Sequence, residues 1–356
     1  MEYENLKLKD VISLEDKKRK PLSAMERNKR KGIYPYYGAQ EIIDSIDDYI
    51  FDGKYILLAE DGENLKSRKK DLVKIVEGKF WLNNHAHIFK TKENVDLEYL
   101  YYYLLKMDLS EYITGSTQPK LNQDNMNKIQ IKLPKLEIQK KISKILSDID
   151  KKIDLNNEIN NNLYEETAAL YKAKFGGIEQ GYKTVGEYII PKRGKNLLTR
   201  DAIEGSIPVV AGGIEPSAYH NQFNTHSPVI TISASGANAG YTNLWSTPIW
   251  ASDCSYIDDS VTENVYFWYV VLKTRQKEIF DAQTGSAQAH IYPRHIADMP
   301  IAELNIDEVR NYNVLVEPLF KKIGENKKEN EQLSQLRDTL LPKLMNGEVD
   351  LDNIEV

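Results

Sequence analysis

Side chains able to do covalent chemistry occur along the chain, but their spacing matches no catalytic motif. A phosphate-binding P-loop needs a lysine directly after its last glycine, whereas GGIEQGYKT (176–184) has Tyr182 at that position. Ser235 lacks the preceding glycine of a Gly-x-Ser-x-Gly nucleophile elbow. No two prolines are adjacent, which excludes the Asn-Pro-Pro-aromatic clamp of amino-methyltransferases. The carboxylates are dispersed, so no pair is assigned as acid and base. The sequence therefore predicts no catalytic residue.

Metal-binding side chains are equally sparse. His85 and His87 could present two imidazoles on one face of a strand, but a zinc site needs further ligands at short spacing. We interpret the pair instead as part of a strand with one face near solvent. Cys254 is the only cysteine, which excludes a disulfide framework and a cysteine-rich zinc module. We expect this chain to bind no metal and no cofactor.

Features suited to binding nucleic acid are more visible. The basic strings KKRK (17–20) and RNKRK (27–31) precede YPYYG (34–38). Further basic strings are SRKK (67–70) and PKRGKN (191–196). Lysine and arginine in such loops suit phosphate contacts, which position a protein on DNA without reading its sequence. The alternative for each string is a solvated surface loop.

Two similar loops could read bases. GSTQPKLN (115–122) and GSAQAHIY (285–292) both combine small residues with a glutamine. The side chains of Gln118 and Gln288 each offer a donor and an acceptor, the pair that matches adenine, although either could instead cap the following helix or turn. The candidate DNA-binding residues are Arg30, Lys31, Tyr36, Asn64, Arg68, Lys69, Thr117, Gln118, Lys120, Arg193, Lys195, Asn196, Asn238, Gln288, His290, Tyr292 and Arg294.

These loops belong to an internal repeat. ILLAEDGENL (56–65) aligns with ITISASGANA (230–239) at an offset of 174 residues. NVDLEYLYYYL (94–104) aligns with NVYFWYVVLKT (264–274), and the two glutamine loops align, all at an offset of 170. The order of the matches is the same in both copies and the offset changes little. The pattern therefore indicates a duplicated structural unit.

Each copy begins with a globular block of mixed composition. Short apolar runs such as YILLA and VITIS are bounded by Gly, Pro, Asn and Asp, which is typical of strands. One apolar-rich stretch in each copy, at 95–106 and 265–280, is long enough for a helix. We expect a mixed α/β (α+β) domain in each copy.

A helical segment follows each globular block, with the 3.5-residue period of a coiled coil. In 136–175 the first core position holds Ile142, Ile149, Asn156, Leu163 and Leu170, and the second holds Ile138, Ile145, Lys152, Ile159 and Glu166. In the last segment the first position holds Val316, Ile323, Asn330, Arg337 and Leu344, and the second holds Tyr312, Leu319, Asn326, Leu333 and Leu340.

An asparagine occupies the first core position in the third heptad of both helical segments. Asn156 and Asn330 stand 174 residues apart, and a buried asparagine in a coiled coil lowers stability but fixes register. Each helix alone could pack on its own domain, but two helices in register favour pairing with one another. A continuous helix over 138–170 would extend about 50 Å and make a stiff spacer.

The composition of the chain excludes several classes of protein. The chain has 356 residues, 41% of them hydrophobic, so a mainly disordered protein is unsupported. The net charge of −6 excludes a globally basic nucleic-acid coat. No apolar run approaches 18 residues, and the polar start MEYENLKLKD is unlike a signal peptide. We therefore expect a soluble cytoplasmic protein.

The whole pattern resembles the specificity subunit of type I restriction–modification systems. Each domain opens with a short segment of the Leu-x-x-Val type, LKLKDVI (6–12) and YKTVGEYI (182–189). Each closes with Gly-Ser-x-Gln and then a Leu/Ile-Pro run, seen in IQIKLPKLEIQKKI (129–142) and IADMPIAEL (296–304). The ending LLPKLMNGEV (340–349) is also similar to that of the family.

The resemblance implies an architecture and a division of labour. It implies two similar target-recognition domains, separated by two long antiparallel helices in a coiled coil, and a pseudo-two-fold internal repeat. The expected boundaries are 1–135 for the first recognition domain, 136–179 for the first spacer helix, 180–304 for the second recognition domain, and 305–356 for the second spacer helix and tail. Each domain would read one half of a bipartite, asymmetric target in double-stranded DNA, and the coiled coil would set the gap.

The resemblance also implies partners that carry the chemistry. The chain would be non-catalytic and would dock two methyltransferase (modification) subunits, and restriction or translocase subunits where they exist. S-adenosylmethionine, ATP and Mg would then be bound by those subunits, and the partners would supply much of the cationic surface. Two alternatives stay open at this point: a non-catalytic bivalent scaffold that binds protein, and a nuclease whose carboxylates meet only in the fold.

Overall fold

The computed structural model describes residues 2–39, 41–285 and 288–351. It divides into two compact units: the first joins 1–152 to 332–356, and the second is 153–331. Two long helices, α6 (Leu136–Phe175) and α10 (Ile306–Met345), each contribute to both units. The structure confirms the mixed α/β class. Within the described ranges, none of the helices is both long and apolar enough to span a bilayer.

The globular part of the first unit is built on small sheets, whose strand pairs are antiparallel except for β3 with β8. Its strands are β1 (Glu4–Lys7), β2 (Ile12–Leu14), β3 (Lys31–Tyr37), β4 (Ile42–Ile46), β5 (Phe51–Asp52), β6 (Tyr55–Ala59), β7 (Val73–Val76), β8 (Lys79–Leu82), β9 (Ala86–Thr91) and β10 (Gln130–Leu133). Its shorter helices are α1 (Leu8–Val11), η1 (Asp16–Lys18), α2 (Ala24–Asn28), α3 (Asn64–Ser67), α4 (Leu97–Lys106), η2 (Ser110–Tyr112) and α5 (Gln123–Met126).

The second unit has a matching set of elements. Its strands are β11 (Lys183–Thr184), β12 (Lys192–Arg193), β13 (Ile207–Val210), β14 (Ala218–His220), β15 (Val229–Ser233), β16 (Thr242–Trp245), β17 (Trp250–Ala251), β18 (Cys254–Ile257) and β19 (Pro300–Ile301). Its shorter helices are η3 (Ile178–Gln180), η4 (Val185–Glu187), η5 (Thr199–Asp201), α7 (Val265–Thr274), α8 (Gln276–Asp281) and α9 (Pro293–Ala297).

The two units share one sheet topology. The strand order β2-β9-β6-β7 in the first corresponds to β12-β18-β15-β16 in the second, and all pairs in both are antiparallel. The order β4-β3-β8 corresponds to β14-β13-β17, and each contains one parallel pair, β3 with β8 and β13 with β17. A tryptophan occupies the equivalent place in each parallel pair, because Trp81 pairs with Tyr36 and Trp250 with Val209. The internal repeat is therefore confirmed.

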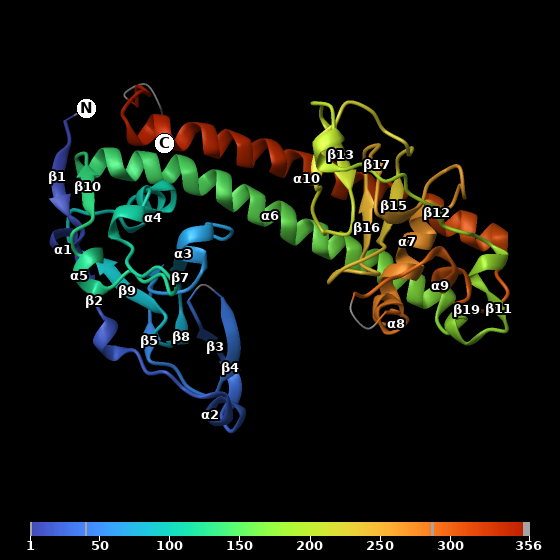
Figure 1. The fold of residues 1–356 in the computed structure, drawn as a ribbon, viewed down its shortest axis with the longest axis horizontal. Coiled ribbons are helices and arrows are strands. Elements are labelled where there is room, and N and C mark those ends of the chain that lie inside the picture. Colours follow the sequence, from blue (N-terminus) through green and yellow to red (C-terminus); the bar gives the residue numbers. More distant parts are fainter. Residues whose placement is uncertain (1, 40, 286–287, 352–356) are drawn as a thin grey trace. The chain divides into compact units, whose positions relative to one another are not determined.

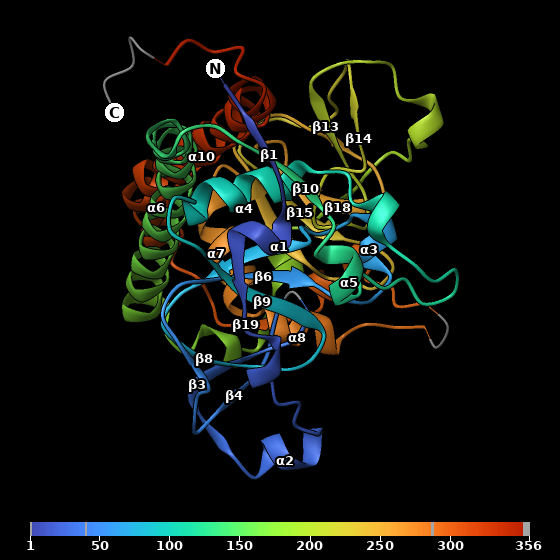
Figure 2. The ribbon, with the colours of Figure 1, turned by 90° about the vertical axis from the view of Figure 1, so that its left-hand side faces the viewer.

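Central strands and one helix form the core of each unit. β6 (YILLA) and β15 (VITIS) are buried along their whole length, which explains their continuous apolar runs. In the first unit α4 covers the sheet that contains β6 and β9 (Figure 2), and Tyr99, Leu100 and Leu104 pack into its core. In the second unit α7 is buried from Val265 to Leu272. Core packing of this kind holds the strand ends in fixed positions.

The long helices pair with each other in antiparallel orientation (Figure 1). The residues that meet run in opposite directions along the two chains: the Tyr312 hydroxyl donates to the Thr167 carbonyl (2.8 Å), and the Asn326 amide donates to Asn160 (2.9 Å). Both helices have 40 residues, and their first residues are 170 apart.

Four asparagines form the polar centre of this pair. The Asn156 amide donates to Asn330 Oδ1 at 2.8 Å, and Asn326 donates to Asn160 Oδ1 at 2.9 Å. Asn330 donates in turn to a fifth asparagine, the exposed Asn157, at 2.9 Å. The two helices align at an offset of 170 residues, so Asn156 is the repeat equivalent of Asn326, and Asn160 is that of Asn330. The two hydrogen-bonded pairs, Asn156–Asn330 and Asn326–Asn160, are therefore equivalent to each other. Asn330 is thus the partner of Asn156 rather than its repeat equivalent.

One part of the heptad frame was wrong. Lys152 and Glu166, placed at the second core position, are exposed, whereas Asn160 and Thr167 are buried. The heptad pattern expected Ile142 to be followed by a buried residue three positions later, at Ile145. The buried residue lies four positions later instead, at Leu146. Each helix packs against its own globular domain as well as against its partner, and this shared packing moves the buried stripe around the helix.

Replacing Asn326 by Ala should destabilise the protein, because the buried Oδ1 of Asn160 then loses its donor. The expected cost is about 1–3 kcal/mol in the free energy of unfolding, measured by urea denaturation followed by circular dichroism. Asn162→Ala is the matched control, since Asn162 is exposed on α6 and Ala favours helix. Equal stability of the two variants would contradict a structural role for the asparagine pairs.

Candidate nucleic-acid interface

The two glutamine loops are closed by the same backbone hydrogen bonds, although residues 286 and 287 of the second loop lie outside the described residues. Thr114 and Lys120 exchange both backbone hydrogen bonds, at 2.8 and 2.7 Å, and Thr284 and His290 do the same at 3.0 and 2.8 Å. Each loop is also tied to the central strand of its unit. The amide of Leu121 donates to the carbonyl of Glu60 directly after β6, and that of Ile291 donates to Ala234 after β15. Both loops therefore project from equivalent strand ends.

A glycine permits each loop to close. Gly115 and Gly285 have φ values of +88° and +101°, which favour glycine. A Cβ at Gly115 would lie 2.2 Å from the carbonyl oxygen of Gln118, and one at Gly285 would lie 2.3 Å from that of Gln288. The turn is thus too tight for a side chain at the glycine, and it places the glutamine three residues later in both units.

The side chains of the two glutamines are exposed, and no hydrogen bond is made by either within the part of the chain that the structure describes. Capping is done by other residues: Asn122 accepts a hydrogen bond from the Asn125 amide at the start of α5. In the second unit, the Tyr292 amide donates to His295 Nδ1 at the start of α9. Gln118 and Gln288 are therefore available for an external partner.

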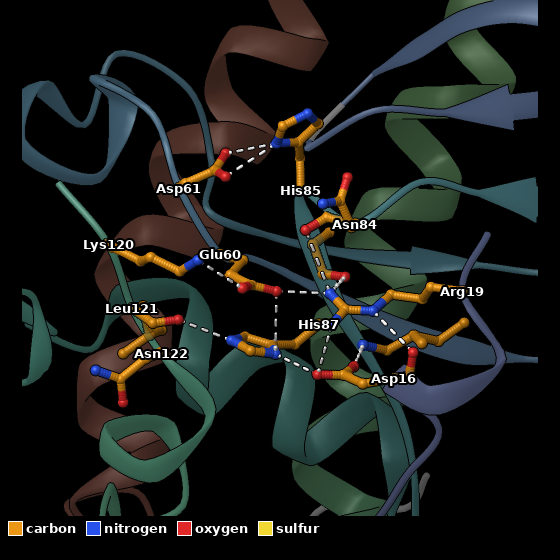
Figure 3. A network of polar contacts seen from close by, with 12 residues as sticks. Asp16, Arg19, Glu60, Asp61, Asn84, His85, His87, Lys120, Leu121 and Asn122 are labelled. Carbon is orange, nitrogen blue, oxygen red and sulfur yellow. Dashed lines mark hydrogen bonds and ion pairs between the residues drawn. The ribbon is translucent and has the colours of Figure 1, made fainter. Parts of the chain in front are cut away.

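A charged network anchors the loop of the first unit (Figure 3). His87, which is 1% exposed, contacts Asp16 through Nδ1 at 2.6 Å and donates to the Leu121 carbonyl through Nε2 at 2.7 Å. Arg19 donates to Glu60 at 2.6 Å, and Lys120 lies 3.2 Å from the other oxygen of Glu60. The network connects η1, β6 and β9 to the loop, so it fixes where the loop begins and ends.

Opposing effects set the pKa of Glu60. Burial alone would raise the pKa of this carboxyl, but the hydrogen bonds and charges of Arg19, His87 and Lys120 together hold it below its usual value. Ligand atoms of Asp16, Glu60 and His87 lie within 4.8 Å of one another, a spacing suited to a metal ion. Arg19 pairs with both Asp16 and Glu60, and Lys120 pairs with Glu60, so these two cations already neutralise the two carboxylates. The network therefore stabilises the loop through ion pairs.

The histidine pair does not form a shared site. His85 lies outside β9 and is exposed, with Nδ1 2.9 Å from Asp61, whereas His87 is buried in the network. The expectation of a strand with one face near solvent fails at His87. The reason is that His87 faces the closed end of the loop rather than the solvent.

The second unit anchors its loop differently. Ala234 follows β15 where Glu60 follows β6, and His290 replaces Lys120 in the backbone bridge. The Ser235 hydroxyl donates to Asp253, which also pairs with Arg193 at 2.6 Å. The same loop geometry is therefore kept with a different set of side chains.

An aromatic and cationic cluster follows the second loop. The rings of His290 and Tyr292 stack with an interplanar angle of 14°, and the Arg294 guanidinium lies 5.9 Å from the Tyr292 ring centroid. The structure thus brings together three residues predicted from the sequence. Stacked rings beside a guanidinium can pack against bases or the sugar–phosphate backbone.

Near the first loop lies an open groove of about 450 Å³. Lys66, Arg68 and Lys106 line it together with Asp108, which is 3.5 Å from Arg68. Lys66 donates to the Ser116 carbonyl at 2.6 Å, so the groove adjoins the glutamine loop. Lys66 and Lys106 were not predicted, because the end of α4 joins the SRKK segment only in the folded unit.

Several predicted contacts have internal partners instead. Arg30 pairs with Asp47 and Asp48 at 2.9 and 3.3 Å, and Lys31 pairs with Asp44 at 2.6 Å. These carboxylates lie on or next to β4, so the RNKRK string is largely neutralised within its own hairpin. The surface of this hairpin is less cationic than the string suggests.

Two other candidates serve the structure. Tyr36 is 1% exposed, and its hydroxyl accepts a hydrogen bond from the Leu22 amide, so its proposed DNA contact is wrong. Tyr36 lies on the inward face of β3, where it pairs with Trp81. The Asn64 side chain bonds both the amide and the carbonyl of Lys70 and closes the intervening loop.

The remaining candidates lie at or near the surface. Lys195 lies 5.9 Å from the ring centroid of Trp250, and the partly exposed Asn238 follows β15. Exposed candidate side chains that make no hydrogen bond or ion pair within the described ranges include Lys69, Thr117, Gln118, Lys195, Asn196, Gln288 and Arg294. Their positions leave them as candidate contacts in both units.

The two units thus share one fold, and each presents a glutamine loop that closes with the same backbone hydrogen bonds but carries different side chains. Residues 1–165 match the family model described as type I restriction modification DNA specificity domain. This part of the chain is therefore similar to the specificity domain of type I restriction–modification systems.

The relatives cover different parts of the chain. The type I restriction enzyme MjaIX specificity subunit of Methanocaldococcus jannaschii is 27% identical over 308 residues, 74% of this chain and 71% of the relative. A protein named as a type I restriction enzyme specificity subunit in Haemophilus influenzae is 35% identical over 139 residues, 39% of this chain but only 35% of the relative. A crystal structure of the S subunit from Mycoplasma genitalium has the same fold (TM-score 0.63, 19% identity), with 97% of this chain and 96% of that one covered.

The Glu60 network predicts a pH-dependent loop. Because the pKa of Glu60 is lowered in the folded state, its ion pairs stabilise the loop above the ordinary pKa near 4.5, and this stabilisation is lost as the pH falls through the lowered value. Hydrogen-exchange protection factors of the Lys120 and Leu121 amides should therefore be flat from pH 7 to about 5 and fall only under more acidic conditions.

Glu60→Gln should reduce the same protection already at pH 7, by about 1.5–3 kcal/mol in opening free energy, because bonds to a charged group are lost. Glu77→Gln is the control, since Glu77 is exposed on the same domain. If Glu60→Gln protected these amides as well as the wild type does, the network would not anchor the loop.

Proposed function

We propose that this chain is the sequence-specific DNA-binding subunit of a type I restriction–modification complex, and that each unit reads one half of a bipartite target. The observation that carries the proposal is the pair of loops. Their backbones close with the same hydrogen bonds, and both expose a glutamine three residues after a glycine with positive φ. A glutamine side chain can bond both the N6 and N7 atoms of adenine in the major groove.

The side chains beside the glutamines support two different half-sites. In the first loop Lys120 is held at Glu60, whereas in the second His290 stacks on Tyr292. Loops that close in the same way but carry unlike side chains would read unlike base sequences, so the target would be asymmetric rather than palindromic.

Partners account for the rest of the activity in this proposal. Many of the predicted cations are paired with carboxylates, and the net charge is −6, so the chain offers limited surface for phosphate contacts. Two methyltransferase subunits docked on the chain would add cationic surface and bring S-adenosylmethionine. Restriction or translocase subunits would bring ATP and Mg. The chain itself is proposed to be non-catalytic.

Gln118→Ala and Gln288→Ala test the proposal in the assembled complex. Each should weaken binding of the target duplex by about 1–3 kcal/mol and relax discrimination at one half-site only, because the two loops are proposed to contact different halves. The measurement is competition binding at fixed salt, with duplexes altered in either half. Gln335→Ala is the control, since Gln335 is exposed on α10. Losses equal to that of the control would contradict base reading by the loops.

The helix pair is proposed to set the gap between the half-sites. One extra heptad at the junction of the units, inserted in α6 after 152 and in α10 after 331, would lengthen the pair by about 10 Å at 1.5 Å per residue. The preferred gap should then grow by about 3 base pairs at 3.4 Å each, with both half-sites unchanged. A seven-residue insertion after Gly347, beyond α10, is the control. An unchanged gap preference in the double insertion would contradict the spacer role.

A further inference from the structure

A pocket of about 240 Å³ lies within the second unit, away from its glutamine loop. α6, α7 and α10 contribute to its walls, together with β16 and the residues next to it. Its aromatic lining consists of Tyr164, Tyr241, Tyr269 and Phe320. The rings of Tyr164 and Tyr269 pack edge to face at 6.1 Å, and Phe320 meets Tyr269 at 5.6 Å. The pocket therefore has a continuous aromatic wall.

Two lysines from different helices line the same pocket. The Lys273 ammonium donates to the Thr242 carbonyl at 3.0 Å and lies 4.4 Å from the Tyr241 ring centroid. Burial lowers the pKa of Lys273, and the charge of Lys327 lowers it further. Neither ammonium has a carboxylate within ion-pair distance among the residues that the structure describes. Two positive charges thus line one pocket, and no described carboxylate makes an ion pair with either of them.

Lys327 is exposed to solvent at the pocket, and neighbouring protein atoms dehydrate its ammonium only in part. This partial dehydration lowers the pKa of Lys327, although the charges of Glu215 and Glu331 act in the opposite direction from beyond ion-pair distance. An anion bound between the lysines would remove their repulsion and restore favourable charge pairing.

Further hydrogen-bond donors line the pocket. The hydroxyl groups of Tyr164 and Tyr269 make no hydrogen bond to any described residue. Burial raises the pKa of Tyr164 to about 12, so this hydroxyl stays protonated and able to donate at neutral pH. Asn161 and Asn243 add amide groups at the rim.

We propose that this pocket binds a small phosphate-bearing molecule with a flat aromatic body. The two ammonium groups and the tyrosine hydroxyls would hold the phosphate oxygens, and the aromatic wall would pack on the ring. Lysine suits phosphate as a compact point charge with three donors. Because Lys273 is on α7 and Lys327 on α10, the bound anion would join the globular domain to the helix pair.

The pocket is not part of the repeated recognition machinery. Under the 170-residue offset between the long helices, Asn157 stands where Lys327 does, and Asp154 stands where Gly324 does. At Gly324 a Cβ would lie 2.6 Å from that of Ser246, so only a glycine allows this close approach to the domain. The features that build the pocket thus occur in one copy of the repeat only.

Calorimetric titration of the full chain with phenyl phosphate and with inorganic phosphate, at constant ionic strength, tests the proposal. Phenyl phosphate should bind saturably at one site and more tightly than inorganic phosphate, because the ring adds contact with the aromatic wall. Lys327→Gln should weaken binding at least tenfold, since a bond to a charged group is lost. Lys328→Gln, the adjacent exposed lysine, should bind like the wild type.

Tyr269→Phe supplies a second variant if Lys327→Gln fails to fold, and it should also weaken phenyl phosphate binding through loss of a donor. The proposal is overturned if neither ligand binds saturably or if binding survives both substitutions. It is equally overturned if Arg294→Gln, near the second glutamine loop, abolishes binding while Lys327→Gln leaves it intact. None of these outcomes depends on DNA recognition by the loops.

Discussion

Buried asparagine amides between two antiparallel helices determine how this chain is assembled. An amide removed from water must find a partner, and the pairs Asn156–Asn330 and Asn160–Asn326 satisfy this requirement at one register. Sliding one helix by a turn would leave polar groups unpaired in the interface. That register also returns the end of α10 to the first unit, where Arg337 pairs with Asp150 and Leu341 and Leu344 enter the core. The first unit is therefore completed by residues from the far end of the sequence.

Backbone hydrogen bonds close the loops of the two units in the same way, and under the proposed function this would let one fold carry two specificities. The bridges at Thr114–Lys120 and Thr284–His290 are made by main-chain groups, and in both units the threonine hydroxyl adds a hydrogen bond to the same carbonyl. The first unit supports its loop with a buried network around Glu60, and the second with Ser235, Asp253 and Arg193. Under the proposed function, base preference could change in one unit while the scaffold of both stayed the same.

Much of this organisation could be predicted from the sequence, where the signal is local or repeated. The duplicated glycine–glutamine loops, the two 40-residue helices and the positions of Asn156 and Asn330 all follow from spacing. What failed depends on contacts between distant segments. The string 27–31 appears free and cationic in sequence, but its carboxylate partners arrive on β4. Tyr36 carries no sign of its burial beneath Trp81, and the groove at Lys66 and Lys106 forms only when α3 meets the end of α4.

Mapping of methylated adenines in genomic DNA tests the central claim most directly: two unlike readers in one chain. Cells would express the complex with the wild-type chain or with a chain in which GSAQAHIY (285–292) is replaced by GSTQPKLN. The account predicts one split methylation motif with two dissimilar halves for the wild type, and a change confined to one half for the exchanged loop. Methylation that is independent of the chain, or a change in both halves together, would contradict it.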